Sequence, residues 1–135
     1  MGSIRAGGLV LLALLGLSAG RTMAASYPAD TVILQGLDKI TARVTTIEAP
    51  VGKPVTFGSL SITARHCDKA PPEDPPEAAA FLEIVDAKPG EAPVKLFTGW
   101  MFASSPAVSA LEHPVYDVWV IDCKNAVKSG AATSP

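Results

Sequence analysis

The sequence predicts a mainly β fold, a small antiparallel β-sandwich or barrel held by one disulfide. Three observations favour this class. Most segments interleave apolar and polar residues and are rich in Val, Ile and Thr, as β-strands are. Turn signals containing Gly or Pro separate these segments at short intervals, and no segment has the periodicity of a long helix. The only two cysteines, Cys67 and Cys123, each end a strand-like segment.

Residues 1–24 predict a signal peptide. Arg5 supplies a basic start, Leu9 to Leu17 form an unbroken apolar run, and Thr22 and Ala24 stand where a signal peptidase reads small residues. The run is shorter than the roughly 20 apolar residues that span a bilayer. We therefore expect a periplasmic or secreted protein with no membrane insertion after cleavage, and an uncleaved membrane anchor is the alternative.

Beyond the signal peptide, the sequence predicts an N-terminal extension over 25–36, a single β domain over 37–123 and a disordered tail over 124–135. Loss of residues 1–24 removes two arginines, so the mature protein is more acidic than the full chain, whose formal net charge is −2. This mild acidity offers no basic surface to nucleic acid, and we expect no nucleic-acid partner.

The first half of the domain is expected to be extended. Leu37 to Ile47 has a β rhythm, Val51 to Pro54 is a turn, and Val55 to Phe57 resumes the strand pattern. Leu60 to Cys67 is the clearest strand. Its alternation places Leu60, Ile62 and Ala64 on one face and Ser61, Thr63, Arg65 and Cys67 on the other.

The segment from Lys69 to Glu77, KAPPEDPPE, predicts an exposed loop, because prolines at this density cannot join a β ladder. Its acids lack the ligand spacing of a calcium loop. Ala79 to Asp86 then returns to strand character, Pro89-Gly90 is a turn, and Val94 to Ala103 is the next strand.

A short helix is predicted near residues 106–112. Ser105 fits the N-cap position and Pro106 the first helical position, and Pro114 ends the helix. Tyr116 to Cys123 is the predicted final strand.

Two cysteines in an exported chain are expected to pair. A bond between Cys67 and Cys123 would close a long loop and stabilise the fold by roughly 4 kcal/mol in the chain-entropy model. No C-x-x-C motif is present, so a thioredoxin-type redox role has no support.

Four stretches resemble the bacterial domain-of-unknown-function family 2155: LDKITARV, VGKPVTFGSL, HCDKAPPEDPPEAAAFLEI and GWMFASSPAVSALEHPVYDVWVIDC. The resemblance covers Leu37 to Cys123, and the last stretch is specific. It implies a small exported protein of mostly proteobacterial envelopes with no assigned activity, so no catalytic residues carry over. Because the resemblance includes the positions of Cys67 and Cys123, it also supports the disulfide.

Aromatic residues concentrate in the segment from Phe97 to Cys123. These residues form either a core or a binding face. Trp100 and Phe102 share a face opposite Met101, so one set is expected to be buried and the other partly exposed. Trp119 is expected on the face of Cys123, near the disulfide. The candidate partner-binding residues are Trp100, Met101, Phe102, His113 and Tyr116.

Two chemistries are weaker alternatives. Soft-metal ligands could come from His66, Cys67, Met101, His113 and Cys123 if the thiols were reduced, although the spacing is not that of a blue-copper loop. A hydrolase could combine Ser104, Ser105 or Ser109 with His113 and Asp117 or Asp122, although no G-x-S-x-G motif surrounds any serine.

The sequence therefore predicts a non-enzymatic exported accessory or interaction protein of the cell envelope. Its partner would be an unidentified envelope protein or complex, with no cofactor and no bound metal. The alternatives are a copper-type metal-binding periplasmic protein and, behind it, a small hydrolase.

Overall fold

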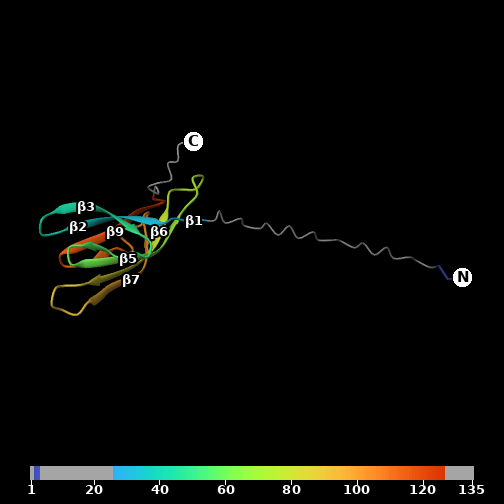
Figure 1. The fold of residues 1–135 in the computed structure, drawn as a ribbon. Helices are drawn as coiled ribbons and strands as arrows, with labels where there is room; N and C mark the ends of the chain where they lie inside the picture. The colour runs from blue at the N-terminus through green and yellow to red at the C-terminus, as the bar shows by residue number, and fades with distance from the viewer. Residues whose placement is uncertain (1, 4–25, 127–135) are drawn as a thin grey trace, which may run out of the picture.

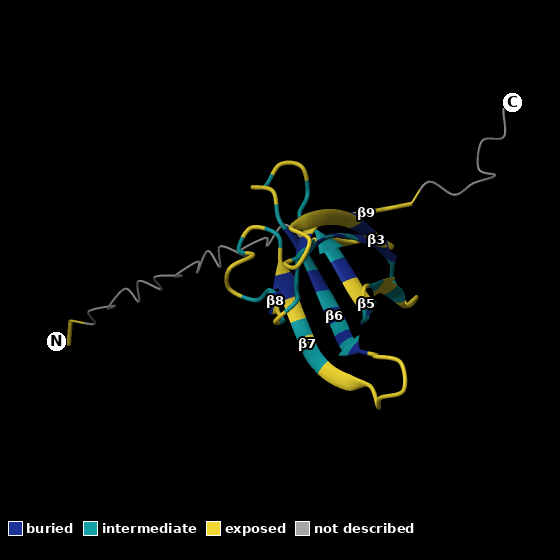
Figure 2. Ribbon diagram, turned by 90° about the vertical axis from the view of Figure 1, so that its left-hand side faces the viewer, coloured by how far each residue is buried: buried dark blue, intermediate teal, exposed yellow. Residues whose placement is uncertain are grey.

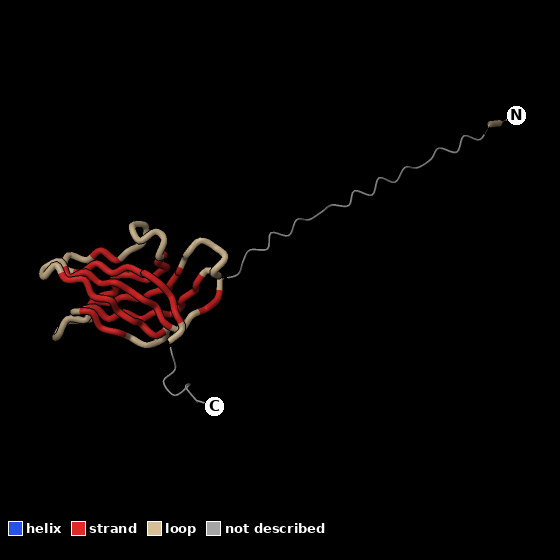
Figure 3. Tube along the Cα trace, turned by 90° about the horizontal axis from the view of Figure 1, so that it is seen from above, coloured by secondary structure: helices blue, strands red, loops and turns tan. Residues whose placement is uncertain are grey.

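The fold is known from a computed structural model that describes residues 2–3 and 26–126. The predicted signal peptide over 1–24 and the predicted tail beyond Ala126 lie outside the described residues, apart from Gly2 and Ser3. Within them the secondary structure is entirely β (Figures 1 and 3). The strands are β1 (Tyr27–Pro28), β2 (Thr31–Asp38), β3 (Arg43–Pro50), β4 (Val55–Phe57), β5 (Leu60–Lys69), β6 (Ala78–Asp86), β7 (Val94–Phe102), β8 (Leu111–Glu112) and β9 (Tyr116–Lys124).

These strands form two antiparallel sheets that pack face to face, as the mainly β class predicted. The five-stranded sheet has the order β1-β5-β6-β7, with β4 also paired to β5. The four-stranded sheet has the order β3-β2-β9-β8. Strand β9 packs on β5 and β6 across the interface, which makes the architecture a sandwich.

The core lies between the sheets and is built by alternate residues. The bands of buried and partly exposed residues along β5 and β6 are visible in Figure 2. Val32 and Leu34 of β2 and Val118 and Val120 of β9 face the buried side chains of β5 and β6. The predicted strands over 79–86, 94–103 and 116–123 are confirmed within one residue at either end.

The predicted helix over 106–112 is wrong. Turns occupy residues 103–110, and Leu111 and Glu112 form strand β8 against Val118 and Asp117. The chain crosses here from the edge of one sheet to the edge of the other, and Leu111 is buried in the core as a strand residue. The local Ser-Pro signal starts a turn instead of a helix, because tertiary packing overrides a capping preference.

The predicted N-terminal extension over 25–36 contains a central strand. β2 pairs with both β3 and β9, and Val32 and Leu34 are fully buried. The segment predicted as continuous from Leu37 to Ile47 is instead a hairpin. Asp38 Oδ1 accepts hydrogen bonds from the backbone N–H groups of Ile40 (2.9 Å) and Thr41 (3.2 Å), which closes the turn between β2 and β3.

Two register shifts change which face the cysteines occupy. The pairing of β5 with β6 shifts between Ala64 and His66, so Cys67 points into the core with Ala64 instead of outward as predicted. The pairing of β2 with β9 shifts opposite Ile121, so Cys123 points inward. Each β-bulge adds one residue to its strand and reverses the later alternation.

The second bulge also overturns the prediction for Trp119. Trp119 lies between Val118 and Val120, which are both buried in the core. Because side chains alternate along a strand, the Trp119 side chain points to the outer face of the four-stranded sheet. Cys123, beyond the bulge, points to the inner face. Trp119 therefore does not share the face of the disulfide.

Candidate functional site

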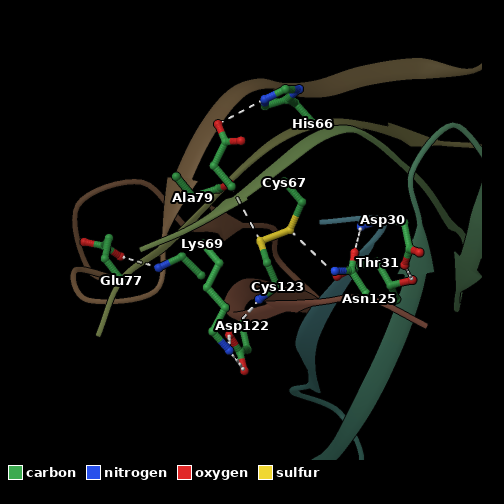
Figure 4. Close-up of a disulfide and its surroundings, with 12 residues drawn as sticks. Asp30, Thr31, His66, Cys67, Lys69, Glu77, Ala79, Asp122, Cys123 and Asn125 are labelled. Atoms are coloured by element: carbon green, nitrogen blue, oxygen red, sulfur yellow. Dashed lines mark hydrogen bonds and ion pairs between the residues drawn. A yellow bond between two sulfur atoms is a disulfide. The ribbon is translucent and has the colours of Figure 1, made fainter. Parts of the chain in front are cut away.

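The disulfide joins the two sheets. Cys67 of β5 and Cys123 of β9 are bonded with a Cα–Cα distance of 5.9 Å, and both are 1% exposed or less. Figure 4 shows the bond between Thr31 on one side and Ala79 on the other, whose carbonyl oxygens lie 3.7 Å from Cys67 Sγ and Cys123 Sγ respectively. A disulfide enclosed by backbone in this way has a structural role, because an attacking thiolate has no direct access.

The five predicted partner-binding residues lie in three different places. Met101 is in the core, at 1% exposure. Trp100 and Phe102 flank it on β7 and point to the outer face of the five-stranded sheet, each 40% exposed. The predicted division between Met101 and its two neighbours is therefore observed. His113 and Tyr116 lie at the end of the sandwich opposite the disulfide, where Tyr116 pairs with Asp38.

The outer face of the five-stranded sheet carries a cluster of rings next to the disulfide. His66, Phe81 and Trp100 are direct neighbours across β5, β6 and β7, and Phe102 lies opposite Ala79 in the next outward position. We call these four residues, His66, Phe81, Trp100 and Phe102, the aromatic face. They come from three strands, so only the sheet register brings them together.

Contacts with its neighbours hold Trp100 in place. Its ring centroid lies 5.6 Å from that of Phe81 and 5.6 Å from that of His66, both in edge-to-face geometry. His66 is in turn held by Asp68, with Nε2 3.0 Å from Oδ2. Edge-to-face pairs contribute about 0.5–1.5 kcal/mol beyond burial. Trp100 is thus exposed but pre-positioned.

The end opposite the disulfide, which we call the closed end, is filled by Phe57, Asp86, His113 and Tyr116. The Tyr116 ring stacks on His113 (5.6 Å between centroids) and meets Phe57 edge-on (5.2 Å). His113 Nε2 lies 3.2 Å from Asp86 Oδ2, and His113 Nδ1 accepts a hydrogen bond from Val115 N–H (3.1 Å). With Nδ1 as an acceptor, Nε2 is the nitrogen that donates to Asp86.

The Asp86 carboxylate is kept ionised at this end. The Ser59 side chain lowers the pKa of Asp86 most strongly, burial opposes this effect, and the hydrogen bond from His113 lowers it further, so the pKa of Asp86 falls below its ordinary value of 3.8. Lys88 Nζ lies 3.7 Å from Asp86 Oδ2. Because His113 and Lys88 come from separate loops, Asp86 ties these two loops together at the closed end.

A cleft of about 620 Å³ lies at the disulfide end, between the Pro-rich loop and the ends of β1 and β9. We call it the Pro-loop cleft. Its walls include Tyr27, Pro72 and Ile121 as apolar groups. Lys69 and Asp122 form an ion pair beside it, with Nζ 3.0 Å from Oδ1, visible in Figure 4.

Most of the described chain is similar to known proteins. Residues 32–123 match the family model described as "Uncharacterized protein conserved in bacteria (DUF2155)". The chain belongs to the DUF2155 family. It is also 34% identical over 87 residues to an uncharacterized protein of Rickettsia prowazekii (strain Madrid E). That alignment covers 64% of this chain and 56% of the relative, so the match spans little more than half of the relative's length. No solved structure matches the chain.

The DUF2155 match includes both cysteines and the whole aromatic face, but it begins after Tyr27 of the Pro-loop cleft. Among the residues that the structure describes, there is no helical stretch with the length and apolar character needed to span a bilayer.

The structure does not assemble the soft-metal ligand set. The disulfide consumes both thiols, Met101 is in the core, and His66 and His113 lie at opposite ends of the sandwich. Within residues 26–126, no group of three or more His, Cys, Asp or Glu side chains is placed to hold a metal ion.

The hydrolase set is also dispersed. Ser104 lies beside the Pro-loop cleft and donates to Glu77, whereas His113 is at the closed end with both ring nitrogens engaged. Asp117 pairs with Lys39 (2.8 Å) and Asp122 with Lys69. A nucleophile and its base must lie within hydrogen-bond reach of each other. No such contact joins the serine of this set to His113.

Sequence reasoning missed His66 and Phe81 as parts of the aromatic face, and Tyr27 as a wall of the cleft. The alternation in Ala79–Asp86 does place Phe81 and Leu82 on opposite faces of the strand. This pattern could have marked Phe81 as an outward residue. Its position beside Trp100 depends on strand register, which the sequence does not state.

Proposed function

We propose that this DUF2155 protein is a non-enzymatic accessory protein of the bacterial cell envelope, acting in the periplasm or after secretion. It binds a partner protein of the envelope through the aromatic face. The apolar leader with its small-residue cleavage site supports export. A disulfide between the two sheets fits an oxidising compartment, where such bonds persist.

The observation that carries this proposal is Trp100. Interface hot spots are enriched in Trp, and they contribute most when the free protein already holds them in the bound position. Trp100 is 40% exposed and is braced by Phe81 and His66. Phe102 enlarges the same surface with equal exposure.

The surroundings of the aromatic face fit the rim of a protein interface. Arg65 and Glu83 form an exposed ion pair of 3.1 Å on the same sheet, and Asp68 binds His66 at the other side. Protein interfaces commonly place apolar rings in the centre and polar or charged groups around them. An envelope protein with an apolar side chain to cover Trp100, and polar groups for this rim, is the expected partner.

The test compares alanine substitutions at two exposed positions, one on the aromatic face and one away from it. Mature protein with a C-terminal tag is incubated with an envelope extract, the retained protein is identified and purified, and its Kd is measured. Trp100→Ala is expected to weaken the binding by about tenfold or more. Val44→Ala, on the β2–β3 hairpin and 53% exposed, serves as the control and should leave Kd unchanged.

The proposal fails if the unmutated protein retains no specific partner. It also fails if a partner binds equally well to Trp100→Ala and to the unmutated protein. Because Trp100→Ala could also disturb its ring neighbours, Phe102→Ala gives a second variant on the same face, with circular dichroism to verify folding.

A further inference from the structure

The Pro-loop cleft has the size and the preformed walls of a ligand site. Pockets that bind small ligands have volumes of about 300–1,000 Å³, and this cleft of about 620 Å³ lies within that range. Its loop wall is stiff because the prolines fix φ. The loop is also tied at its base, where Ala70 N–H donates to the Glu77 carbonyl (2.9 Å), and in its turn, where Asp74 N–H donates to the Pro71 carbonyl (3.0 Å).

The charges along the cleft do not cancel. Its charged side chains are Lys69, Asp74, Glu77 and Asp122. Lys69 and Asp122 neutralise each other through their ion pair of 3.0 Å. In the described part of the chain, neither Asp74 nor Glu77 has a cationic partner within ion-pair distance.

Glu77 is held in place as a carboxylate by neutral donors. Its Oε1 accepts hydrogen bonds from the backbone N–H groups of Ala78 (3.0 Å) and Ser104 (3.1 Å), and its Oε2 accepts one from the Ser104 hydroxyl. Burial tends to raise the pKa of Glu77, but the bonds from Ser104 and Ala78 outweigh it and hold the pKa below 4.5. The carboxylate is therefore charged and oriented, and no cation among the described residues balances it.

Apolar groups line the same cleft as these acids. Tyr27 and Ile121 are each 39% exposed and line the same cleft as Pro71 and Pro72. A ligand that pairs with both the acids and the apolar residues of the cleft needs a cationic head for the acids and an apolar stem for the ring and aliphatic groups. An anionic ligand would be repelled, and a purely apolar one would leave the charges unpaired.

We propose that the Pro-loop cleft binds a primary alkylammonium group, with Glu77 and Asp74 facing the charge and Tyr27 and Ile121 packing on the alkyl stem. The group could belong to a free amine or to a lysine side chain of a peptide. The site is independent of the aromatic face, since the two share no residue.

The test uses three probes of equal length and different charge. ¹⁵N-labelled mature protein is titrated with n-pentylamine, n-pentanol and pentanoate, and the amide signals of Ala78 and Ser104 are followed. Pentylamine should give saturable shifts at both amides, pentanol should bind about tenfold more weakly, and pentanoate should not bind.

Matched variants locate the effect. Glu77→Gln should weaken pentylamine binding by about tenfold, and Glu83→Gln, the same change at a carboxylate outside the cleft, should leave it unchanged. Because Glu77 also holds Ser104, Asp74→Asn provides a second cleft variant that does not touch this hydrogen bond. Trp100→Ala should have no effect, which separates failure of this site from failure of the aromatic face.

A second arm titrates a short peptide with one lysine and its norleucine counterpart. Binding of the lysine peptide alone assigns the site to a side chain of a partner, and binding of pentylamine alone assigns it to a free amine. Absence of saturable shifts with both probes overturns the proposal. Equal binding of pentanoate and pentylamine, or full binding by both Glu77→Gln and Asp74→Asn, overturns it as well.

Discussion

The two ends of the sandwich are closed in different ways. At one end a disulfide joins β5 to β9, and the Pro-loop cleft and the aromatic face lie beside it. At the other, His113, Tyr116 and Asp86 are packed against one another with no covalent link between the sheets. The closed end uses its polar and aromatic groups for contacts within the protein. At the disulfide end, comparable groups remain partly exposed.

This difference indicates that the covalent bond allows the disulfide end to remain open. A cross-link stabilises the fold mainly through the unfolded chain, so it does not require that every neighbouring space be filled. The closed end has no such bond and depends on close packing. We therefore propose that the disulfide end is the binding end and that the closed end is structural. The following predictions test that division, from the largest expected effect to the smallest.

Removal of the disulfide should cause the largest loss of stability. Cys67→Ala combined with Cys123→Ala is expected to lower the free energy of unfolding by about 4 kcal/mol, because the bond links residues 56 positions apart. Urea unfolding of the oxidised protein and of the double variant measures this difference. A loss below about 1 kcal/mol would show that the disulfide end does not depend on its covalent bond.

Gly58 tests the packing at the closed end. It has a left-handed backbone (φ 58°), and a Cβ there would clash with the Tyr116 ring and hydroxyl. Gly52 also has positive φ (86°), but a Cβ there meets nothing within 4 Å. Gly52→Ala should therefore cost only the backbone term of about 1–2 kcal/mol, and Gly58→Ala distinctly more. Equal losses in thermal or urea unfolding would mean that Tyr116 is not tightly packed.

Acid should weaken the closed end through Asp86. Its pKa is lowered in the folded state, so its contribution to stability is fully present above the ordinary value of 3.8 and is lost as the pH falls below it. Asp86→Asn should reduce stability at neutral pH and flatten the decline in acid. Urea midpoints measured between neutral pH and acid test this, and an unchanged acid slope in Asp86→Asn would contradict it.

Phe102→Ala should have the smallest effect on stability. Its side chain is 40% exposed and opposes only Ala79, so the loss should be about 1 kcal/mol or less. Met101→Ala, one position earlier and in the core, should cost about 2–5 kcal/mol. Similar losses for the two variants in urea unfolding would mean that the aromatic face is part of the core.

The sequence was sufficient to predict most strands, because alternation is a local signal. It also predicted that Trp100 and Phe102 oppose Met101. It could not predict the faces of Cys67 and Cys123, since each depends on a bulge that is fixed by pairing with a distant strand. The helix expected after Ser105 failed for a related reason, because the burial of Leu111 in the core outweighed the local capping signal.

The candidate sites were less predictable than the fold. The aromatic face unites residues of three strands, and the Pro-loop cleft brings Tyr27 near Ser104 and Ile121. Such groupings follow from register and topology, which single-sequence patterns do not specify. His113 and Tyr116 were predicted as binding residues from their chemistry, but the fold uses that chemistry to hold the closed end.

Site-specific photo-crosslinking tests the central claim most directly. A benzoylphenylalanine replaces Phe102 on the aromatic face in one protein, and Ile40, which is 77% exposed on the hairpin next to the closed end, in another. Both are irradiated in envelope extract. Our account predicts a discrete protein adduct from position 102 that disappears when Trp100→Ala is added, and none from position 40. An adduct from position 40 alone, or the same adduct at position 102 with and without Trp100→Ala, would contradict it.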